Sequence, residues 1–215
     1  MIRDFDENEK VISVAEMRAA DAYTIENHVP GKELMYRASY GVYESFDWEG
    51  KRTLIFCGGG NNGGDGYALA MIMAGRGHDV SVVRYSDKLS ADGGYYFEKC
   101  IEAGVTVMDK TDLTQDRVRD VDVAVDCILG TGFTGEVRGS AREAIEMINS
   151  MRPWATVISV DINSGMNGDS GEAGLAVISD LTVSIGFLKT GFFKGRADEL
   201  IGRLVNVDIG IVFEE

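Results

Sequence analysis

Thr53-Leu54-Ile55-Phe56-Cys57, an apolar stretch typical of a buried strand, runs directly into Gly58-Gly59-Gly60-Asn61-Asn62-Gly63-Gly64-Asp65-Gly66, and a second apolar stretch begins at Tyr67. Glycine has no Cβ, so it tolerates positive φ and lets a ligand approach the backbone closely. Between a strand and a helix, such a loop directs backbone N–H groups at an anion, and the helix dipole adds to the attraction. The stretch therefore predicts a site for a phosphate-bearing molecule, most simply a nucleotide.

Strand-like and helix-like segments alternate from residue 51 onward, and the strands are rich in Val and Ile. This alternation predicts a parallel sheet with helices on both faces. The expected fold class is α/β, a Rossmann-like three-layer sandwich with a doubly wound, mostly parallel sheet. The expected strands are 52–57, 79–85, 105–108, 121–128, 155–161, 181–186 and 203–209, and the expected helices between them are 64–76, 90–103 and 139–150.

Two further helices are expected before the first of these strands. Ser13 and Glu16 have the spacing of a capping box, which predicts a helix that runs to about Asn27. Pro30-Gly31 should end it, and a second helix is expected over 32–48. These extra N-terminal helices are an addition to the minimal doubly wound unit.

The bulk composition is that of a single globular domain. The chain has 215 residues, of which 45 % are hydrophobic and 26 % charged, with no linker or repeat. We therefore expect one domain over 1–215, with a flexible, acidic tail over residues 1–10. No apolar run approaches the roughly 18–20 residues of a membrane span, and the N-terminus lacks the features of a signal peptide. The expected location is cytoplasmic.

The net charge of −14 restricts the partners. A nucleic-acid binder or a protein of anionic membrane surfaces needs a basic surface, so neither partner is expected. A phosphate-bearing ligand would have to be held against a repulsive field. Backbone N–H groups, a few basic side chains or a bound cation would have to compensate for that field.

Three glycine-rich loops follow the carboxyl ends of strands, at 58–66, 126–139 and 161–171. In a doubly wound sheet of order 3-2-1-4-5, the strands before these loops are neighbours. Their carboxyl ends flank the point where the strand order reverses, which is where ligands bind in such sheets. We therefore expect the three loops to converge on one site.

Asp126 and Asp161 each end an apolar strand beside one of these loops. A strand-end aspartate often only caps the following turn. Two of them on neighbouring strands could instead hold a cation or supply an acid–base group. Oxygen ligands from Asn62, Asp126 and Ser164 would suit a hard cation rather than zinc.

A Rossmann-type NAD-dependent dehydrogenase is an alternative, because two stretches match G-x-G-x-x-G by letter. The Asn61-Asn62 pair and Asp65 fit that motif poorly, since they place side-chain oxygens where a pyrophosphate needs bare backbone. A P-loop is excluded because no Lys followed by Ser or Thr is present in the loop. The two matching stretches are Gly58, Gly60, Gly63 and Gly130, Gly132, Gly135.

The loops resemble those of the NAD(P)H-hydrate epimerases, also called YjeF N-terminal domains, and the resemblance covers nearly the whole chain. The matching segments are Asn61-Asn62-Gly63-Gly64-Asp65-Gly66, Asp126-Cys127-Ile128-Leu129-Gly130-Thr131-Gly132, Val160-Asp161-Ile162-Asn163-Ser164-Gly165, Val14-Ala15-Glu16-Met17-Arg18, and Ser184-Ile185-Gly186-Phe187 with Lys189 and Gly191. The chain departs from the commonest family pattern at Asn163, where Pro is usual, and at Tyr36-Arg37, where Glu-Asn is frequent. The resemblance is to a stand-alone epimerase without the fused dehydratase domain.

The resemblance implies a metabolite-repair isomerase that interconverts the R and S forms of hydrated NADH or NADPH (NADHX, NADPHX) at C6 of the nicotinamide ring. It implies one potassium ion per subunit as cofactor, a homodimer, and a separate NAD(P)HX dehydratase as functional partner. The implied potassium ligands are Asn62, Asp126 and Ser164. The implied substrate-binding residues are Asn61, Asn62, Gly63, Gly64, Asp65, Gly130, Thr131, Gly132, Phe133, Thr134, Gly135, Glu136 and Asp161.

The reaction needs a general acid that later serves as base, because C6 is a hemiaminal carbon that must lose and regain water. Asp161 is the expected catalytic residue, since it lies where the three loops should meet. Lys189 and Arg138 are candidate phosphate partners, or else solvated surface charges. A non-catalytic nucleotide-binding or scaffold domain of the same fold remains an alternative to the enzyme.

Overall fold

The computed structural model describes residues 2–4 and 9–214, and its centre is an eight-stranded sheet of order β1-β10-β8-β7-β6-β3-β4-β5. Every neighbouring pair in the sheet is parallel. The section β5-β4-β3-β6-β7 has the expected order 3-2-1-4-5, so the doubly wound α/β fold class is confirmed. The strands are β1 Ile2–Asp4, β3 Thr53–Cys57, β4 Val80–Arg84, β5 Thr106–Asp109, β6 Val123–Cys127, β7 Thr156–Val160, β8 Leu181–Ile185 and β10 Arg203–Val207.

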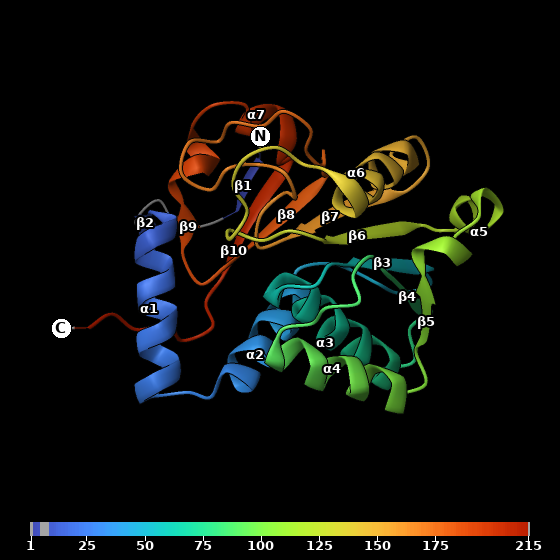
Figure 1. Ribbon diagram of the computed structural model, residues 1–215, viewed down its shortest axis with the longest axis horizontal. Helices are drawn as coiled ribbons and strands as arrows, with labels where there is room; N and C mark the ends of the chain where they lie inside the picture. Colours follow the sequence, from blue (N-terminus) through green and yellow to red (C-terminus); the bar gives the residue numbers. More distant parts are fainter. Residues whose placement is uncertain (1, 5–8, 215) are drawn as a thin grey trace.

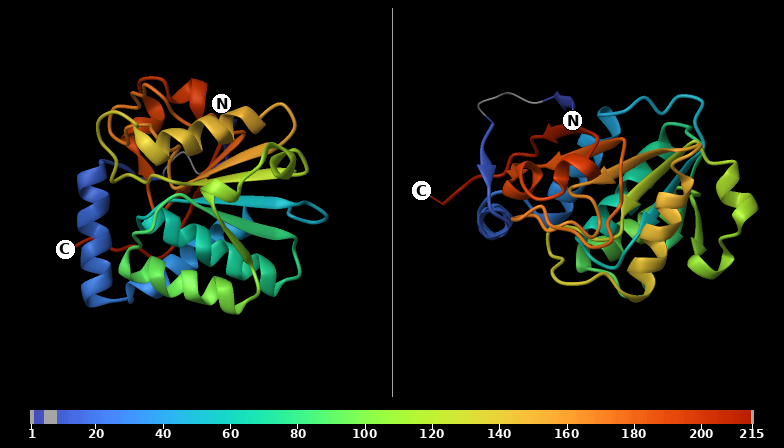
Figure 2. Two further views of the ribbon diagram at one scale, coloured as in Figure 1. Left: turned by 45° about the vertical axis from the view of Figure 1, so that its right-hand side comes forward. Right: turned by 90° about the horizontal axis from the view of Figure 1, so that it is seen from above.

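Helices cover both faces of the sheet (Figure 1). One face carries α2, α3 and α4, the other carries α6 and α7, and α1 stands beside one end of the sheet (Figures 1 and 2). None of the described helices is long and apolar enough to cross a membrane. The helices are α1 Val14–Asn27, α2 Gly31–Glu44, α3 Asn61–Gly75, α4 Ala91–Glu102, α5 Gln115–Arg119, α6 Gly139–Met151 and α7 Ala197–Leu200, with 3₁₀ turns at Lys110–Asp112 and Thr190–Phe193.

Alternation of side chains along the strands builds a core on each face. In β3, Ile55 and Cys57 pack into the cluster beneath α2, α3 and α4, whereas Leu54 and Phe56 pack into the cluster beneath α6. Successive side chains of a strand point to opposite faces, so an all-apolar strand serves both cores. This explains why β3 is buried at all five positions.

A second, two-stranded sheet joins the start of the chain to its late segment. In it, β2 (Val11–Ile12) pairs in parallel with β9 (Leu188–Lys189), and Ile12 lies opposite Lys189. The sequence did not predict this sheet, because two-residue strands carry no periodic pattern. The expectation of a flexible tail over residues 1–10 also differs from the structure, since Ile2–Asp4 pairs with β10 as β1. The other tail residues Met1 and 5–8 lie outside the described residues.

The glycine-rich stretch is mostly helix rather than loop. Helix α3 begins at Asn61, three residues before the expected start, and Gly64 N donates to Gly60 O at 3.2 Å in its first turn. A Cβ at Gly66 would lie 2.6 Å from Cys57 Sγ and 2.9 Å from Cys127 Cβ. These contacts show that glycine here lets α3 lie directly against β3 and β6. Helix α2 also ends at Glu44, earlier than the expected 48.

Gly66→Ala should lower the free energy of unfolding by about 1–3 kcal/mol, the usual range for overpacking a close-packed core. The matched control is Gly75→Ala in the same helix, where a Cβ meets nothing within 4 Å. Relief of glycine's backbone entropy should make that control more stable by roughly 0.5–1 kcal/mol. Urea unfolding of both variants measures the difference. Equal stabilities would show that α3 does not need glycine to approach the sheet.

Candidate active site

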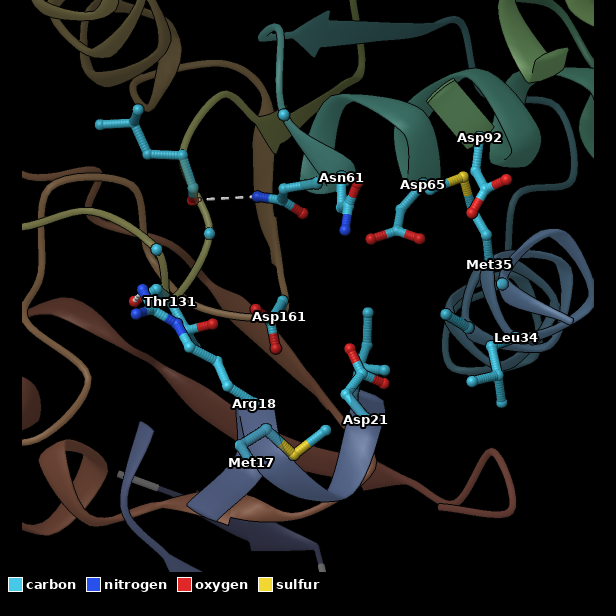
Figure 3. A pocket seen from close by; sticks show the side chains of 18 of the residues that line it. Met17, Arg18, Asp21, Leu34, Met35, Asn61, Asp65, Asp92, Thr131 and Asp161 are labelled. Atoms are coloured by element: carbon cyan, nitrogen blue, oxygen red, sulfur yellow. Dashed lines mark hydrogen bonds between the residues drawn. The ribbon is translucent and has the colours of Figure 1, made fainter. Parts of the chain in front are cut away.

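A cavity of about 500 Å³ lies where the carboxyl ends of β3, β6 and β7 meet, as the convergence of the loops predicted. Figure 3 shows side chains from the glycine turn, from the loop after β6 and from α1 and α2 pointing into it. Its floor is Asp161, the first residue after β7. The lining residues are Met17, Arg18, Asp21, Ile25, Gly31, Leu34, Met35, Ala38, Gly59, Gly60, Asn61, Asn62, Asp65, Asp92, Ile128, Leu129, Gly130, Thr131, Gly132, Phe133, Asp161, Ile185 and Ile209.

Asp161 has an unusual backbone conformation and forms an ion pair with a buried lysine. Its φ is 66°, a left-handed value that is uncommon outside glycine. Lys189 Nζ lies 2.5 Å from Asp161 Oδ1, and the lysine side chain is fully buried. The same nitrogen donates to Ile185 O at 2.9 Å and to Ser184 Oγ at 3.2 Å. Asp161 therefore lines the cavity with a carboxylate that is paired to a buried ammonium group.

This geometry corrects both expectations for Lys189. A solvated surface charge is wrong because the side chain is fully buried. A phosphate partner is wrong because the three N–H groups of the ammonium already have acceptors within the protein. Burial of a lysine is unfavourable unless its charge is paired and hydrogen-bonded. Here Asp161 pairs the charge, and Ser184 Oγ and Ile185 O accept the other hydrogen bonds.

Three further carboxyl groups line the cavity with Asp161, those of Asp21, Asp65 and Asp92 (Figure 3). Burial raises the pKa of Asp65 well above its ordinary value, and the charges of Asp161 and Asp21 raise it further. Burial also raises the pKa of Asp21, with the charge of Asp161 as the second cause. Lys189 opposes both shifts and does not cancel them. The cavity therefore favours neutral carboxyl groups beside one ion-paired aspartate.

The three expected cation ligands are linked by hydrogen bonds through Leu129, which lines the cavity together with Asn62. Ser164 Oγ donates to Asp126 Oδ1 at 2.5 Å, and Leu129 N donates to Ser164 Oγ at 2.8 Å. Asn62 Nδ2 donates to Leu129 O at 3.0 Å, while the buried Asn62 Oδ1 has no hydrogen-bond partner among the described residues. Burial raises the pKa of Asp126, and hydrogen bonds, chiefly from Ser164, oppose that rise.

The residues of the second loop divide between two cavities. Gly130, Thr131, Gly132 and Phe133 line the main cavity. Phe133 also borders a neighbouring cavity of about 400 Å³, which is lined by Thr134 and Gly135 as well. The expected substrate-binding residue Glu136 lies at the surface instead. Its carboxylate pairs with Arg138 at 2.7 Å, and both side chains are about four-fifths exposed (79 % and 82 %).

The expected residues of the first loop lie at one wall of the main cavity. Asn61, Asn62 and Asp65 line it from the first turns of α3. Gly63 and Gly64 are buried in that same turn and pack against neighbouring backbone and side chains, rather than lining the cavity. The glycines therefore shape the wall, and the polar side chains between them face the open space.

Helix α1 forms a wall of the cavity that sequence reasoning missed. The predicted capping box is present, since Ser13 Oγ accepts from Glu16 N and Glu16 accepts from Ser13 N. Val14 N also donates to Asp169 Oδ1 at 2.8 Å, which ties the helix start to the third loop. Arg18 and Asp21 project from α1, and Arg18 Nη2 lies 3.5 Å from Thr131 O. Only the family-like segment 14–18 could have drawn attention to this helix.

Helix α2 supplies an apolar wall made of Leu34, Met35 and Ala38. The neighbouring Tyr36 and Arg37, which depart from the family pattern, do not line the cavity. Tyr36 stacks on Tyr40 with ring centroids 6.2 Å apart, and Arg37 pairs with Glu33 at 3.0 Å. The departure therefore falls on the outer side of the helix.

Comparison with known proteins identifies the family. The model of the YjeF-related protein N-terminus matches residues 31–191. A Limosilactobacillus fermentum protein named NAD(P)H-hydrate epimerase is 32 % identical over 207 residues, which are 93 % of this chain and 97 % of that protein. A Methanothermobacter thermautotrophicus protein named bifunctional NAD(P)H-hydrate repair enzyme Nnr is 34 % identical over 94 % of this chain, which spans only 40 % of that protein.

The fold has a solved counterpart in the crystal structure of yeast ynu0. The two chains superpose with a TM-score of 0.77 at 20 % identity, over 88 % of this chain and 86 % of the yeast chain. At that identity the match concerns the fold alone. The sequence match over three quarters of the chain carries the assignment, and the chain belongs to the family of YjeF-related protein N-terminal domains.

Proposed function

We propose that the protein is an NAD(P)H-hydrate epimerase, an isomerase that interconverts the R and S forms of hydrated NADH or NADPH at C6 of the nicotinamide ring. The observation that carries this proposal is Asp161, held by the buried Lys189 at the floor of the cavity where the three loops meet. Relatives that match nearly end to end are named for this activity. The dinucleotide is then the substrate, not a cofactor.

The chemistry needs a proton carrier beside C6. Protonation of the C6 hydroxyl lets water leave with the electrons of the C–O bond, and the lone pair of the ring nitrogen forms an iminium. Water that returns to the opposite face inverts the carbon. Asp161 has the position for this proton transfer, and its ion pair with Lys189 fixes the direction of the carboxylate.

Binding of the phosphates has to overcome the net charge of −14. The first turn of α3, a helix of 15 residues, points backbone N–H groups toward the cavity wall. Arg18 brings a guanidinium to the same cavity from α1. Guanidinium groups bind phosphates in a bidentate manner, so we assign Arg18 to the pyrophosphate of the substrate.

We further propose that Asn62, Asp126 and Ser164 hold one potassium ion per subunit. The buried, unpartnered Asn62 Oδ1 supports this proposal, because a buried oxygen without a donor calls for a cation or a water. Asp126 and Ser164 offer carboxylate and hydroxyl oxygens, the ligands of hard cations, and Ser164 contacts Leu129 as Asn62 does. A bound cation would add positive charge beneath the phosphate-binding loops.

The proposed cellular setting is a cytoplasmic homodimer that works beside a separate NAD(P)HX dehydratase. The bifunctional relatives support a linked activity, since they are named as repair enzymes and extend far beyond the segment that this chain matches. Sedimentation of the purified protein tests the dimer, and a coupled assay with a dehydratase tests the partnership.

Asp161→Asn should lower the rate of epimerisation by a factor on the order of 10²–10⁴, the usual contribution of a general acid–base group. Asparagine tolerates the left-handed backbone, so the fold should be retained. Chromatographic separation of the NADHX epimers over time gives the rate, and Asp198→Asn on the exposed side of α7 is the control. Inversion at the wild-type rate would remove Asp161 from the mechanism. Hydride transfer to NAD⁺ from a panel of alcohols would instead support a dehydrogenase.

Arg18→Met should raise the KM for NADHX on the order of tenfold and leave kcat nearly unchanged. A hydrogen bond to a charged group contributes about 1.5–3 kcal/mol, and a phosphate far from C6 is bound equally in ground and transition states. Steady-state kinetics separate the two constants. An unchanged KM would place the pyrophosphate elsewhere.

Potassium should raise the melting temperature more than sodium does at equal ionic strength, because an ion that binds only the folded state stabilises it by mass action. Asn62→Leu removes the unpartnered oxygen and should abolish the difference between the two salts. Thermal unfolding in KCl and NaCl measures the effect without any reference to activity. Identical melting curves for the wild-type protein in both salts would exclude this site.

A further inference from the structure

The carboxyl group of Asp65 is a feature of the cavity that the reaction above does not use. Asp65 lies in the second turn of α3, where Ser39 Oγ donates to its backbone carbonyl at 2.9 Å and fixes the turn. Within residues 2–4 and 9–214, its side chain accepts no hydrogen bond and forms no ion pair. Figure 3 shows this carboxyl pointing into the same open space as Asp161 and Asp21.

The surroundings of Asp65 disfavour its charged form. Burial is the main cause, the charges of Asp161 after β7 and Asp21 from α1 add to it, and the ammonium of Lys189 from β9 opposes it. Asp92 from α4 and Arg18 from α1 line the same cavity. Lys189 is already paired with Asp161. The two carboxyl groups therefore differ in kind, because Asp161 has a cationic partner and Asp65 has none. Two carboxyl groups in such unlike surroundings can serve as an acid and a base.

Inversion at C6 imposes a geometric requirement that one such group does not meet. The hydroxyl leaves from one face of the ring, and water adds to the other face. A carboxyl group beside one face does not touch the oxygen on the opposite face. Direct proton transfer needs contact of about 2.6–3.2 Å, and the alternative is a relay through one water. A proton carrier on each face makes both transfers direct.

We propose that Asp65 is a second catalytic residue, which carries the proton on the face of C6 opposite to Asp161. The proposal rests on the epimerase function proposed above. The two residues reach the cavity from different elements, α3 and the end of β7, so that a planar ring can lie between them.

For one epimer, the Asp65 carboxyl gives its proton to the C6 hydroxyl. The C6–O bond breaks with both electrons on the departing water, and the nitrogen lone pair forms the C=N bond. A water molecule on the side of Asp161 forms the new C6–O bond, the C=N electrons return to nitrogen, and Asp161 accepts the proton. One proton has moved from Asp65 to Asp161, and exchange with solvent restores both groups. The other epimer follows the same steps in reverse, from the form in which solvent exchange has placed the proton on Asp161 rather than on Asp65.

The test is exchange of the C6 hydroxyl with H₂¹⁸O, followed separately for each purified NADHX epimer. Asp65→Asn should slow inversion on the order of 10²–10⁴-fold. It should still exchange oxygen with retention in one epimer, because Asp161 can expel and re-add water on its own face. Asp161→Asn should show the mirror result, with exchange in the other epimer alone. The control is again Asp198→Asn, which should behave as wild type.

Inversion at the wild-type rate in Asp65→Asn would overturn the proposal. Exchange of the same epimer in both variants, or loss of exchange for both epimers in Asp65→Asn, would overturn it as well, because neither fits one carrier on each face. A wild-type protein that does not invert NADHX would remove the epimerase function itself, so the two failures can be told apart.

A stability measurement separates lost chemistry from lost folding. Because the folded state raises the pKa of Asp65, it binds this proton more tightly than the unfolded chain. The wild-type protein then loses stability as the pH rises above about 4, the pKa of an unfolded aspartate. Asparagine has no proton to lose. The melting temperature of Asp65→Asn relative to wild type should therefore increase between pH 4 and pH 7, and a decrease would contradict the protonated state.

Discussion

The buried ion pair between Lys189 and Asp161 is the interaction on which the site depends. A lysine ammonium is taken fully out of water, and its three protons are used by a carboxylate, a hydroxyl and a backbone carbonyl. Such a group is stable only while all of its partners are present. Asp161 in turn adopts a left-handed backbone at the end of β7. The Asp161 carboxylate is therefore held by its ion pair with Lys189 and by the backbone conformation at the end of β7.

Close approach of backbone is the second constraint. Helix α3 lies so near β3 and β6 that a methyl group at Gly66 would meet two cysteine side chains. This proximity sets the distance between the sheet and the first turns of α3. It therefore also sets the positions of Asn61, Asn62 and Asp65. The glycines act mainly through packing, and the polar residues between them face the ligand. One short segment thus determines both the shape of the wall and its chemistry.

The topology of the sheet could be predicted from the sequence, because Val- and Ile-rich strands alternate with helices and each strand is bounded by turns. The convergence of the three loops followed from that topology. The wall formed by α1 could not be predicted, since nothing in the residues of α1 states which element the helix will face. Lys189 was misjudged for a similar reason: its burial arises from β2 and β9, whose two-residue strands have no sequence signal. Glu136, which was expected to bind the substrate, follows Gly135 (φ 92°) and is exposed at the surface in a pair with Arg138.

The pairing of β2 with β9 has a consequence for handling and engineering the protein. Ile12, near the beginning of the chain, is the register partner of the lysine that pairs with Asp161. An affinity tag, a fusion partner or a truncation that disturbs β2 would therefore disturb the strand that carries Lys189. A tag or fusion partner should disturb the fold less at the other end of the chain, beyond Phe213, where the described residues form no strand.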